Sequence, residues 1–306
     1  MLNSINASKT NNRQMPTFQP MGFGGILDTT LSLYRNNFRL FLGIASIYFI
    51  FVALQEFIVV FLLEKSSTPN LDSFISDVDI MLDTLVAMLV AGMLVIACSE
   101  IYLGRSVTIQ IALRRFRSRF LVYLGASLIY LLVGYVWMMN SWGNSILVSL
   151  ARIAYLPFLC IYLVSWIFYG PVVLLEEPIA VQALERSKRL VQGTWRRVLG
   201  IILAITLFSL AIDYILGSSF GVILALFGVV RDGSLMETVT SLFGFKYIVD
   251  RPTSTVSLIM YLIYRAAETF TLPIEAIGVT LLYFDLRIRK EAFDIEMQAH
   301  NTQNLM

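Results

Sequence analysis

The sequence contains very few of the residues on which most metal sites and hydrolytic sites depend. It has 2 cysteines and 1 histidine among 306 residues, and only 14% of its residues are charged. A zinc centre needs several cysteine or histidine ligands, and a serine-hydrolase triad needs a histidine that acts as the base. A Walker A phosphate-binding loop is also absent. We therefore expect no metal, no cofactor and no catalytic residues.

The sequence is instead rich in long apolar stretches. Hydrophobic residues make up 57% of the chain, and the mean hydropathy is +0.74. Crossing a bilayer takes about 20 consecutive apolar residues in a helix. Six such stretches predict an all-α, polytopic bundle of membrane-spanning helices: residues 40–63, 84–103, 120–139, 146–175, 198–230 and 255–285. The last three exceed one perpendicular crossing, and Pro157, Pro171 and Pro273 are candidate kink positions.

The chain is predicted to form a single membrane domain over residues 21–296, flanked by polar segments. Residues 1–20 lack the apolar core of a signal peptide, so we expect them to be a disordered cytoplasmic tail. Residues 297–306 are expected to form a second cytoplasmic tail. The first span then serves as the insertion signal.

Positive charge is concentrated on alternate connections between the spans. Most of the 23 lysine and arginine residues precede the first span, follow the sixth, or lie in the second and fourth connections. Basic loops resist translocation, so this pattern predicts that both termini are cytoplasmic. We expect the membrane to be a bacterial plasma membrane. The first outer loop is predicted to carry acidic residues: Glu64, Asp72, Asp77, Asp79 and Asp83.

Basic amphipathic segments precede three of the spans, at residues 23–34, 108–119 and 180–191. Each has apolar residues on one helical face, which predicts three interfacial helices on the cytoplasmic leaflet. Internal duplication explains this pattern slightly better than chance similarity between basic flanks. The arginines predicted to contact anionic lipid headgroups are Arg35, Arg39, Arg114, Arg115, Arg117, Arg186, Arg189, Arg196 and Arg197.

Several blocks of the sequence occur in the order typical of one membrane family. They are residues 24–28, 33–38, 171–176, 183–187, 190–193 and 282–296. With these blocks the chain resembles the glycerophosphoryl diester phosphodiesterase membrane-domain family. The positions that match its motifs are Asp28, Tyr34, Arg35, Glu176, Arg186, Ser187, Gly193, Tyr283, Asp285, Arg287, Arg289, Glu291 and Asp294. One departure is Ala292, where the family pattern has glycine.

The resemblance implies a membrane domain without the catalytic part of the family's fused members. Their phosphodiesterase barrel takes roughly 250 residues and a metal-dependent, acid-base site. This chain has neither the extra length nor the histidines. We therefore expect a stand-alone membrane domain that is not an enzyme.

Ionisable residues inside the predicted spans are candidate functional positions, since charge is costly in lipid unless it is paired or hydrated. One candidate network comprises Glu56, Arg152, Asp213, Arg265 and Glu268. A more cytoplasmic set comprises Glu100, Glu268 and Glu275, with Arg105 close enough to pair. These residues predict either a polar pathway or headgroup pocket, or pairing between helices; we favour the pairing. Asp28, Glu176 and Asp285 are expected to be arginine partners or helix caps.

Two classes of function are compatible with these features. The first is a non-catalytic membrane protein that organises lipids or anchors a partner protein, as a monomer or a homo-oligomer. The second is a transporter or flippase-like carrier of a small solute or lipid, which buried charge, kinked spans and repeats would suit. A nucleic-acid partner is not needed to explain the basic residues.

Overall fold

A computed structural model describes residues 19–62, 69–138, 146–176, 179–226 and 255–292. These residues form helices with the following bounds: α1 (Phe23–Asn36), α2 (Phe38–Leu62), α3 (Pro69–Tyr102), α4 (Ile109–Met138), α5 (Ile146–Trp166), α6 (Tyr169–Leu175), α7 (Ala180–Val191), α8 (Trp195–Leu226) and α11 (Thr255–Glu291). The predicted tails, residues 1–20 and 297–306, lie almost wholly outside the described residues.

The prediction of an all-α membrane protein with six spanning helices is confirmed. Six stretches of the described helices are long and apolar enough to cross a membrane. No strand occurs in the described part of the chain. A helix satisfies its own backbone hydrogen bonds, which is why apolar sequences of this length adopt it in lipid.

The second span begins well before the predicted residue 84. Helix α3 starts at Pro69, and its apolar spanning part is Val78–Tyr102. Asp79 and Asp83 were predicted to lie in the outer loop, but both are buried inside this helix. The sequence-based boundary was wrong because polar partners on other helices compensate these two acids.

The fourth span is not one helix but two, which the sequence did not predict. Helix α5 contains Pro157 and ends at Trp166, and α6 begins at Tyr169, so that Pro171 lies in the first turn of α6. Proline is tolerated in a first turn because its missing N–H would have no helical partner there. The amide of Phe168 donates to Ser187 Oγ of α7 at 3.1 Å. A side chain from another helix therefore provides the hydrogen-bond acceptor for a backbone amide at this break.

Two of the three predicted amphipathic segments form separate helices. Asn37 separates α1 from α2, and its amide donates to the carbonyl of Leu33 at 3.1 Å. Gly193, with φ +81°, ends the turn between α7 and α8. The prediction of a separate helix at residues 108–119 was wrong. These residues continue into α4, because the sequence has no glycine or proline before Gly125 to end the helix.

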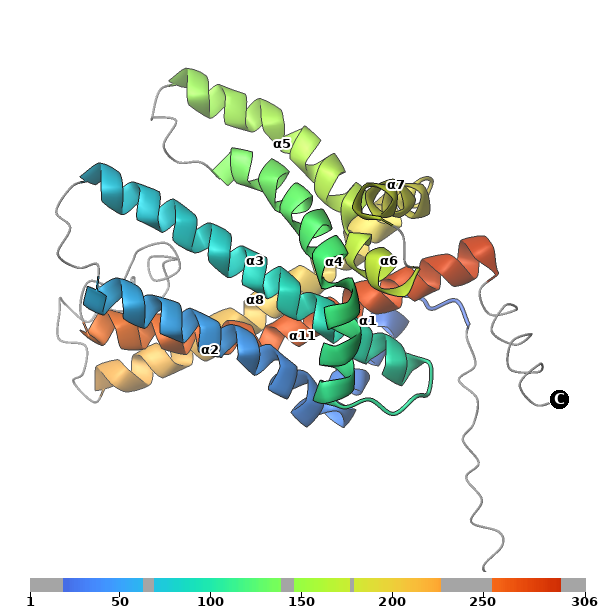
Figure 1. Cartoon of the computed structure of the whole chain (residues 1–306), viewed down its shortest axis with the longest axis horizontal. Helices are drawn as coiled ribbons and strands as arrows, with labels where there is room; N and C mark the ends of the chain where they lie inside the picture. Colours follow the sequence, from blue (N-terminus) through green and yellow to red (C-terminus); the bar gives the residue numbers. More distant parts are fainter. Residues whose placement is uncertain (1–18, 63–68, 139–145, 177–178, 227–254, 293–306) are drawn as a thin grey trace, which may run out of the picture.

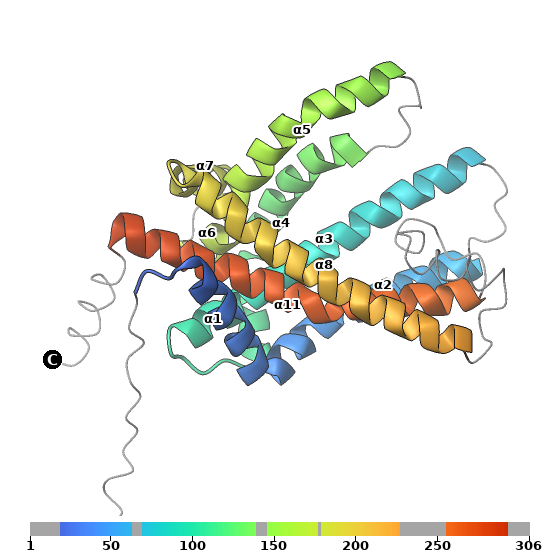
Figure 2. The ribbon, with the colours of Figure 1, turned by 180° about the vertical axis from the view of Figure 1, so that it is seen from behind.

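Helix α11 runs through the middle of the bundle. Helices α2 and α3 lie in front of it in Figure 1, and α8 lies in front of it in Figure 2. The C-terminal end of α4 and the N-terminal end of α5 stand apart from the ends of the other spanning helices. The last span is the most buried of the six. Polar residues on α11 are therefore enclosed by protein rather than presented to lipid.

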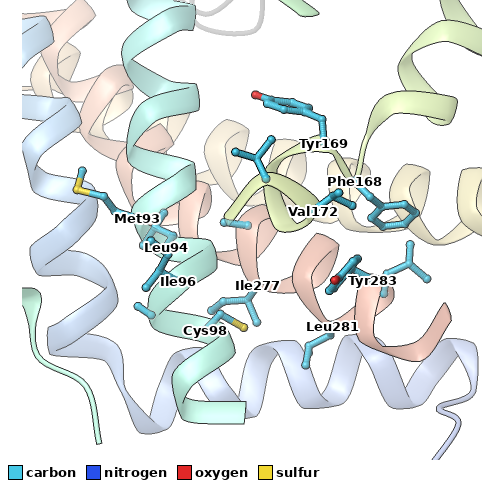
Figure 3. Close-up of a cluster of buried hydrophobic side chains, with 14 of the residues drawn as sticks. Met93, Leu94, Ile96, Cys98, Phe168, Tyr169, Val172, Ile277, Leu281 and Tyr283 are labelled. Carbon is cyan, nitrogen blue, oxygen red and sulfur yellow. The ribbon is translucent and has the colours of Figure 1, made fainter. Parts of the chain in front are cut away.

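A cluster of buried apolar side chains lies where α3, α6 and α11 meet (Figure 3). The rings of Phe168 on α6 and Tyr283 on α11 are 6.3 Å apart. The core residues labelled in Figure 3 are Met93, Leu94, Ile96, Cys98, Phe168, Tyr169, Val172, Ile277, Leu281 and Tyr283. The ring contact between Phe168 and Tyr283 brings the start of α6 close to α11, near the ionic contacts described below.

Candidate functional site

A buried charge cluster lies between α2, α3 and α11, with Arg265 at its centre. The guanidinium contacts Asp83 Oδ2 at 2.6 Å and Glu268 Oε2 at 2.8 Å. It also donates to the hydroxyl of Tyr48 at 3.1 Å, and its carbon lies 4.9 Å from the ring centre of Tyr261. Four side chains from three helices therefore surround one cation.

The same cluster continues toward Glu56 and Asp79. Gln55 donates through Nε2 to Asp79 Oδ1 at 2.5 Å. Glu56 follows Gln55 on α2 and is only 1% exposed. The Tyr261 hydroxyl also donates to Asp83 Oδ2 at 3.4 Å, which joins the two parts of the cluster.

Several buried polar atoms of this cluster have no hydrogen-bond partner among the described residues. They are Gln55 Oε1, Glu56 Oε2, Asp83 Oδ1 and Arg265 Nε. An unpaired buried polar atom costs about 1–3 kcal/mol. Most native proteins avoid this cost, so the concentration of four such atoms in one place calls for a physical explanation.

The cluster contains part of the predicted intramembrane network. Arg265, Glu268 and Glu56 belong to it, whereas Asp213 of α8 accepts a separate hydrogen bond from Thr271 Oγ1 at 2.8 Å. The side chain of Arg152 lies outside the described residues. Sequence reasoning missed the contributions of five residues: Tyr48, Gln55, Asp79, Asp83 and Tyr261. The two aspartates could have been predicted as part of the cluster if the second span had been extended from residue 84 toward Pro69, where α3 begins.

Acidic residues outnumber basic ones in the described interior of the spans. Asp213 of α8 accepts from Thr271 of α11, and Glu268 and Glu275 lie one helical turn to either side of Thr271. A buried ion pair stabilises a protein only when geometry and hydrogen bonds offset the desolvation of both charges. Arg265 contacts Asp83 and Glu268 directly, but it meets that condition only in part, because Asp83 Oδ1 and Arg265 Nε have no hydrogen-bond partner among the described residues.

A second set of ionic contacts, the Arg186 network, joins α6, α7 and α11. Arg186 pairs with Glu176 at 2.8 Å and with Glu291 at 2.6 Å. Tyr283 donates its hydroxyl to Glu176 at 2.8 Å, and Arg287 pairs with Glu291 at 3.2 Å. All five residues were predicted as family-motif positions. The contacts Arg186–Glu291 and Tyr283–Glu176 join residues 105 and 107 positions apart.

A third set, the Asp285 network, holds the start of the described chain. Asp285 is fully buried and pairs with Arg197 at 2.9 Å and Arg289 at 3.0 Å. It also accepts the amide of Met21 at 2.7 Å, while both arginines donate to the Met21 carbonyl. The expectation that Glu176 and Asp285 pair with arginine is thus met in the structure. Asp28 is exposed on α1.

The remaining positions predicted as family motifs differ in their surroundings: some have structural contacts, Arg35 is exposed, and Asp294 lies outside the described part. Ser187 is buried, accepts from Phe168, and donates to the Ser165 carbonyl at 2.9 Å. Tyr34 donates to the Phe270 carbonyl at 2.9 Å.

The arginines predicted to contact lipid fall into two groups. Arg186 and Arg197 belong to the networks above, and Arg115 pairs with Glu100 while remaining about half exposed. The predicted pairing of Arg105 with Glu100 is also present, at 3.6 Å. The exposed arginines without a salt bridge among the described residues are Arg35, Arg39, Arg114, Arg117, Arg189 and Arg196.

The described residues contain no group of three or more histidine, cysteine, aspartate or glutamate side chains that could hold a metal ion. Comparisons of the chain with protein-family models, with curated proteins and with solved structures gave no match. The functional conclusion therefore depends on the geometry of the buried charge cluster, the two ionic networks and the exposed arginines.

Proposed function

We propose that the protein is a non-enzymatic, multi-pass membrane protein that organises anionic lipids or anchors a partner protein at the cytoplasmic leaflet. The supporting observation is the set of exposed arginines on α1, α4 and α7 and in the first turns of α2 and α8. The helix segments that carry them lie toward the same end of the bundle in Figure 1. Arginines near anionic headgroups each contribute about 1 kcal/mol of attraction. In this proposal the membrane is a bacterial plasma membrane and both termini are cytoplasmic.

The ionic networks give this basic end a fixed shape. The Arg186 network ties α7 to α6 and α11, and the Asp285 network ties the segment before α1 to α8 and α11. The two separate amphipathic helices, α1 and α7, are therefore attached to the spanning bundle. We propose that both lie at the interface, with their exposed arginines among the headgroups.

The family resemblance is part of the same proposal. It is supported by the Arg186 network, in which motif residues from separate blocks meet. It is also supported by Ala292, which has φ 51° directly after α11, a conformation that glycine adopts without strain. We propose a stand-alone member of the glycerophosphoryl diester phosphodiesterase membrane-domain family. Such a chain is expected to show no phosphodiesterase activity in a purified sample.

Native mass spectrometry of the protein extracted with its surrounding lipid into nanodiscs tests the lipid role. The test variant replaces Arg35, Arg39, Arg114 and Arg117 with glutamine. The matched control neutralises the basic residues that the sequence assigns to the other connections: Lys65, Arg231, Lys246 and Arg251. The proposal expects retained anionic lipid to fall in the test variant and to stay unchanged in the control.

Proteomics on the same sample tests the anchoring role. A stoichiometric protein partner that is lost in the arginine variant supports anchoring at the basic end. Equal lipid and partner retention in the wild type, the test variant and the control would contradict the proposal.

A second candidate function, a carrier of a small solute or lipid, is favoured by the buried charge cluster. Its residues lie on three spanning helices, and transporters place such sites near the membrane midplane at broken or kinked helices. A small solute that is retained by the wild type, and lost in Glu56→Gln or Arg265→Gln, would support this candidate. Retention of the same solute by both variants would count against it.

A further inference from the structure

Helices α8 and α11 pack side by side, and two contacts show which of their residues face one another. Ile205 of α8 packs on Gly278 of α11, where a Cβ atom would lie 2.5 Å from Ile205 Cδ1. Further along α8, Asp213 accepts a hydrogen bond from Thr271 of α11 at 2.8 Å. Residue numbers therefore rise along α8 as they fall along α11, which makes the two helices antiparallel.

Ser209 of α8 and Glu275 of α11 lie between these two contacts. Ser209 is one helical turn from each of the α8 residues that make the contacts, and Glu275 is one turn from each of the α11 residues. Residues three or four positions apart share one face of a helix. Ser209 and Glu275 therefore face the opposite helix at the same level, next to Asp213 and Thr271. We call these four residues the α8–α11 polar layer.

The α8–α11 polar layer contains two acidic residues and no basic residue. Asp213 and Glu275 make no salt bridge within the described part of the chain. Arg265, the arginine nearest to them along α11, is paired with Asp83 and Glu268 instead. Both acids lie in stretches that are apolar enough to span a membrane, where an uncompensated carboxylate is costly. The layer therefore favours a bound species that carries positive charge.

A second observation points to a bound species in the layer. The side chain of Ser209 is 1% exposed, and its Oγ has no hydrogen-bond partner among the described residues. Its neighbours Asp213 and Thr271 are also buried, with exposed fractions of 6% and 3%. Buried side-chain polar atoms mostly have a partner. A cation between the two helices would bind the free lone pairs of this oxygen.

The side chains of the layer suit a cation with the ligand preference of Ca²⁺. All four offer oxygen atoms, which Ca²⁺ binds, whereas Zn²⁺ is bound mainly by nitrogen and sulfur. Two carboxylates and two hydroxyls present six oxygen atoms, and Ca²⁺ takes about six to eight. Its double charge also balances the two carboxylates, which the single charge of Na⁺ would not. The hydroxyl oxygens thus complete a ligand set that two acidic residues would not form alone.

We propose that Asp213, Glu275, Ser209 and Thr271 form a binding site for one Ca²⁺-like divalent cation between α8 and α11. The two carboxylates provide the charge, and the two hydroxyl groups provide neutral oxygen ligands. The site does not depend on the proposed lipid role. If the protein is a carrier, the site holds a cation that is transported or coupled to transport.

Isothermal titration with Ca²⁺ tests the site on the full chain, after treatment with a chelator, in nanodiscs of zwitterionic lipid. This lipid avoids the background of Ca²⁺ bound by anionic headgroups. The variants are Asp213→Asn, Glu275→Gln and Ser209→Ala. The matched controls are Ser219→Ala, an exposed hydroxyl on α8, and Asp28→Asn, an exposed acid on α1.

The proposal expects one saturable Ca²⁺ site per chain in the wild type and in both controls. Each of the three variants is expected to lower the affinity by at least about tenfold. Absence of saturable binding in the wild type would overturn the proposal, and so would wild-type affinity in Asp213→Asn and Ser209→Ala. Displacement of the bound Ca²⁺ by an equal concentration of Na⁺ would also overturn it, because the site would then not select a divalent charge.

Ser209→Ala keeps both carboxylates, so it tests the site if an acidic variant does not fold. Retention of anionic lipid, measured as for the arginine variant, is expected to stay unchanged in all three variants. A failure of the cation site is therefore distinguishable from a failure of the lipid proposal.

Discussion

Replacing Asp285 with asparagine is expected to destabilise the fold by about 3 kcal/mol. The carboxylate is fully buried and is shared by Arg197, Arg289 and the amide of Met21. Asparagine keeps the shape of the side chain but removes its charge, so two guanidinium groups lose their anionic partner. Breaking a buried pair costs about 3–5 kcal/mol. We expect a loss at the lower end of this range, because both arginines are about one-third exposed and can be hydrated.

Unfolding of the purified protein in mixed micelles, with increasing sodium dodecyl sulfate and detection by helical circular dichroism, measures this loss. The control is Asp28→Asn, an exposed acid on α1 that is expected to change stability by less than about 0.5 kcal/mol. A loss below about 1 kcal/mol for Asp285→Asn would refute the reasoning, because the Asp285 network would then contribute no more than a surface pair.

Two further substitutions test backbone strain and close packing by the same unfolding assay. Ala292→Gly is expected to stabilise the protein by about 1 kcal/mol, because Ala292 has φ 51° where a Cβ is unfavourable; an unchanged midpoint would contradict this. Gly92→Ala is expected to destabilise it by about 1–3 kcal/mol, because a Cβ would meet Phe116 at 2.7 Å and Tyr123 at 2.8 Å; no loss would show that both rings move freely.

The spanning helices could be predicted because their signal is local. Apolar runs of sufficient length are helical in lipid whatever their neighbours are. The pairing of Glu176 and Asp285 with arginine was also predictable, since acidic residues beside basic segments at a span end have partners within reach. The identity of those partners was not, because Arg186 meets Glu291, and Arg287 meets Glu176, through contacts between distant segments.

The buried charge cluster was only partly predictable. Arg265, Glu56 and Glu268 could be identified as charged residues within apolar runs. The two aspartates of α3, Asp79 and Asp83, were instead predicted to lie in a loop. Asp83 is compatible with a spanning helix because Arg265 of α11 compensates it, and that contact joins residues 182 positions apart. The break before α6 has a similar cause, since Ser187 of α7 satisfies the amide of Phe168.

Cysteine labelling in intact cells tests the central claim, which is that the arginine-rich end faces the cytoplasm. The background replaces the buried Cys98 and the exposed Cys160, and single cysteines are introduced at Asn12, Ser67 and Asn144. With a reagent that does not cross the membrane, the account predicts labelling of Ser67→Cys and Asn144→Cys, and labelling of Asn12→Cys only after lysis. Strong labelling of Asn12→Cys in intact cells would contradict the orientation and the cytoplasmic lipid role that depends on it.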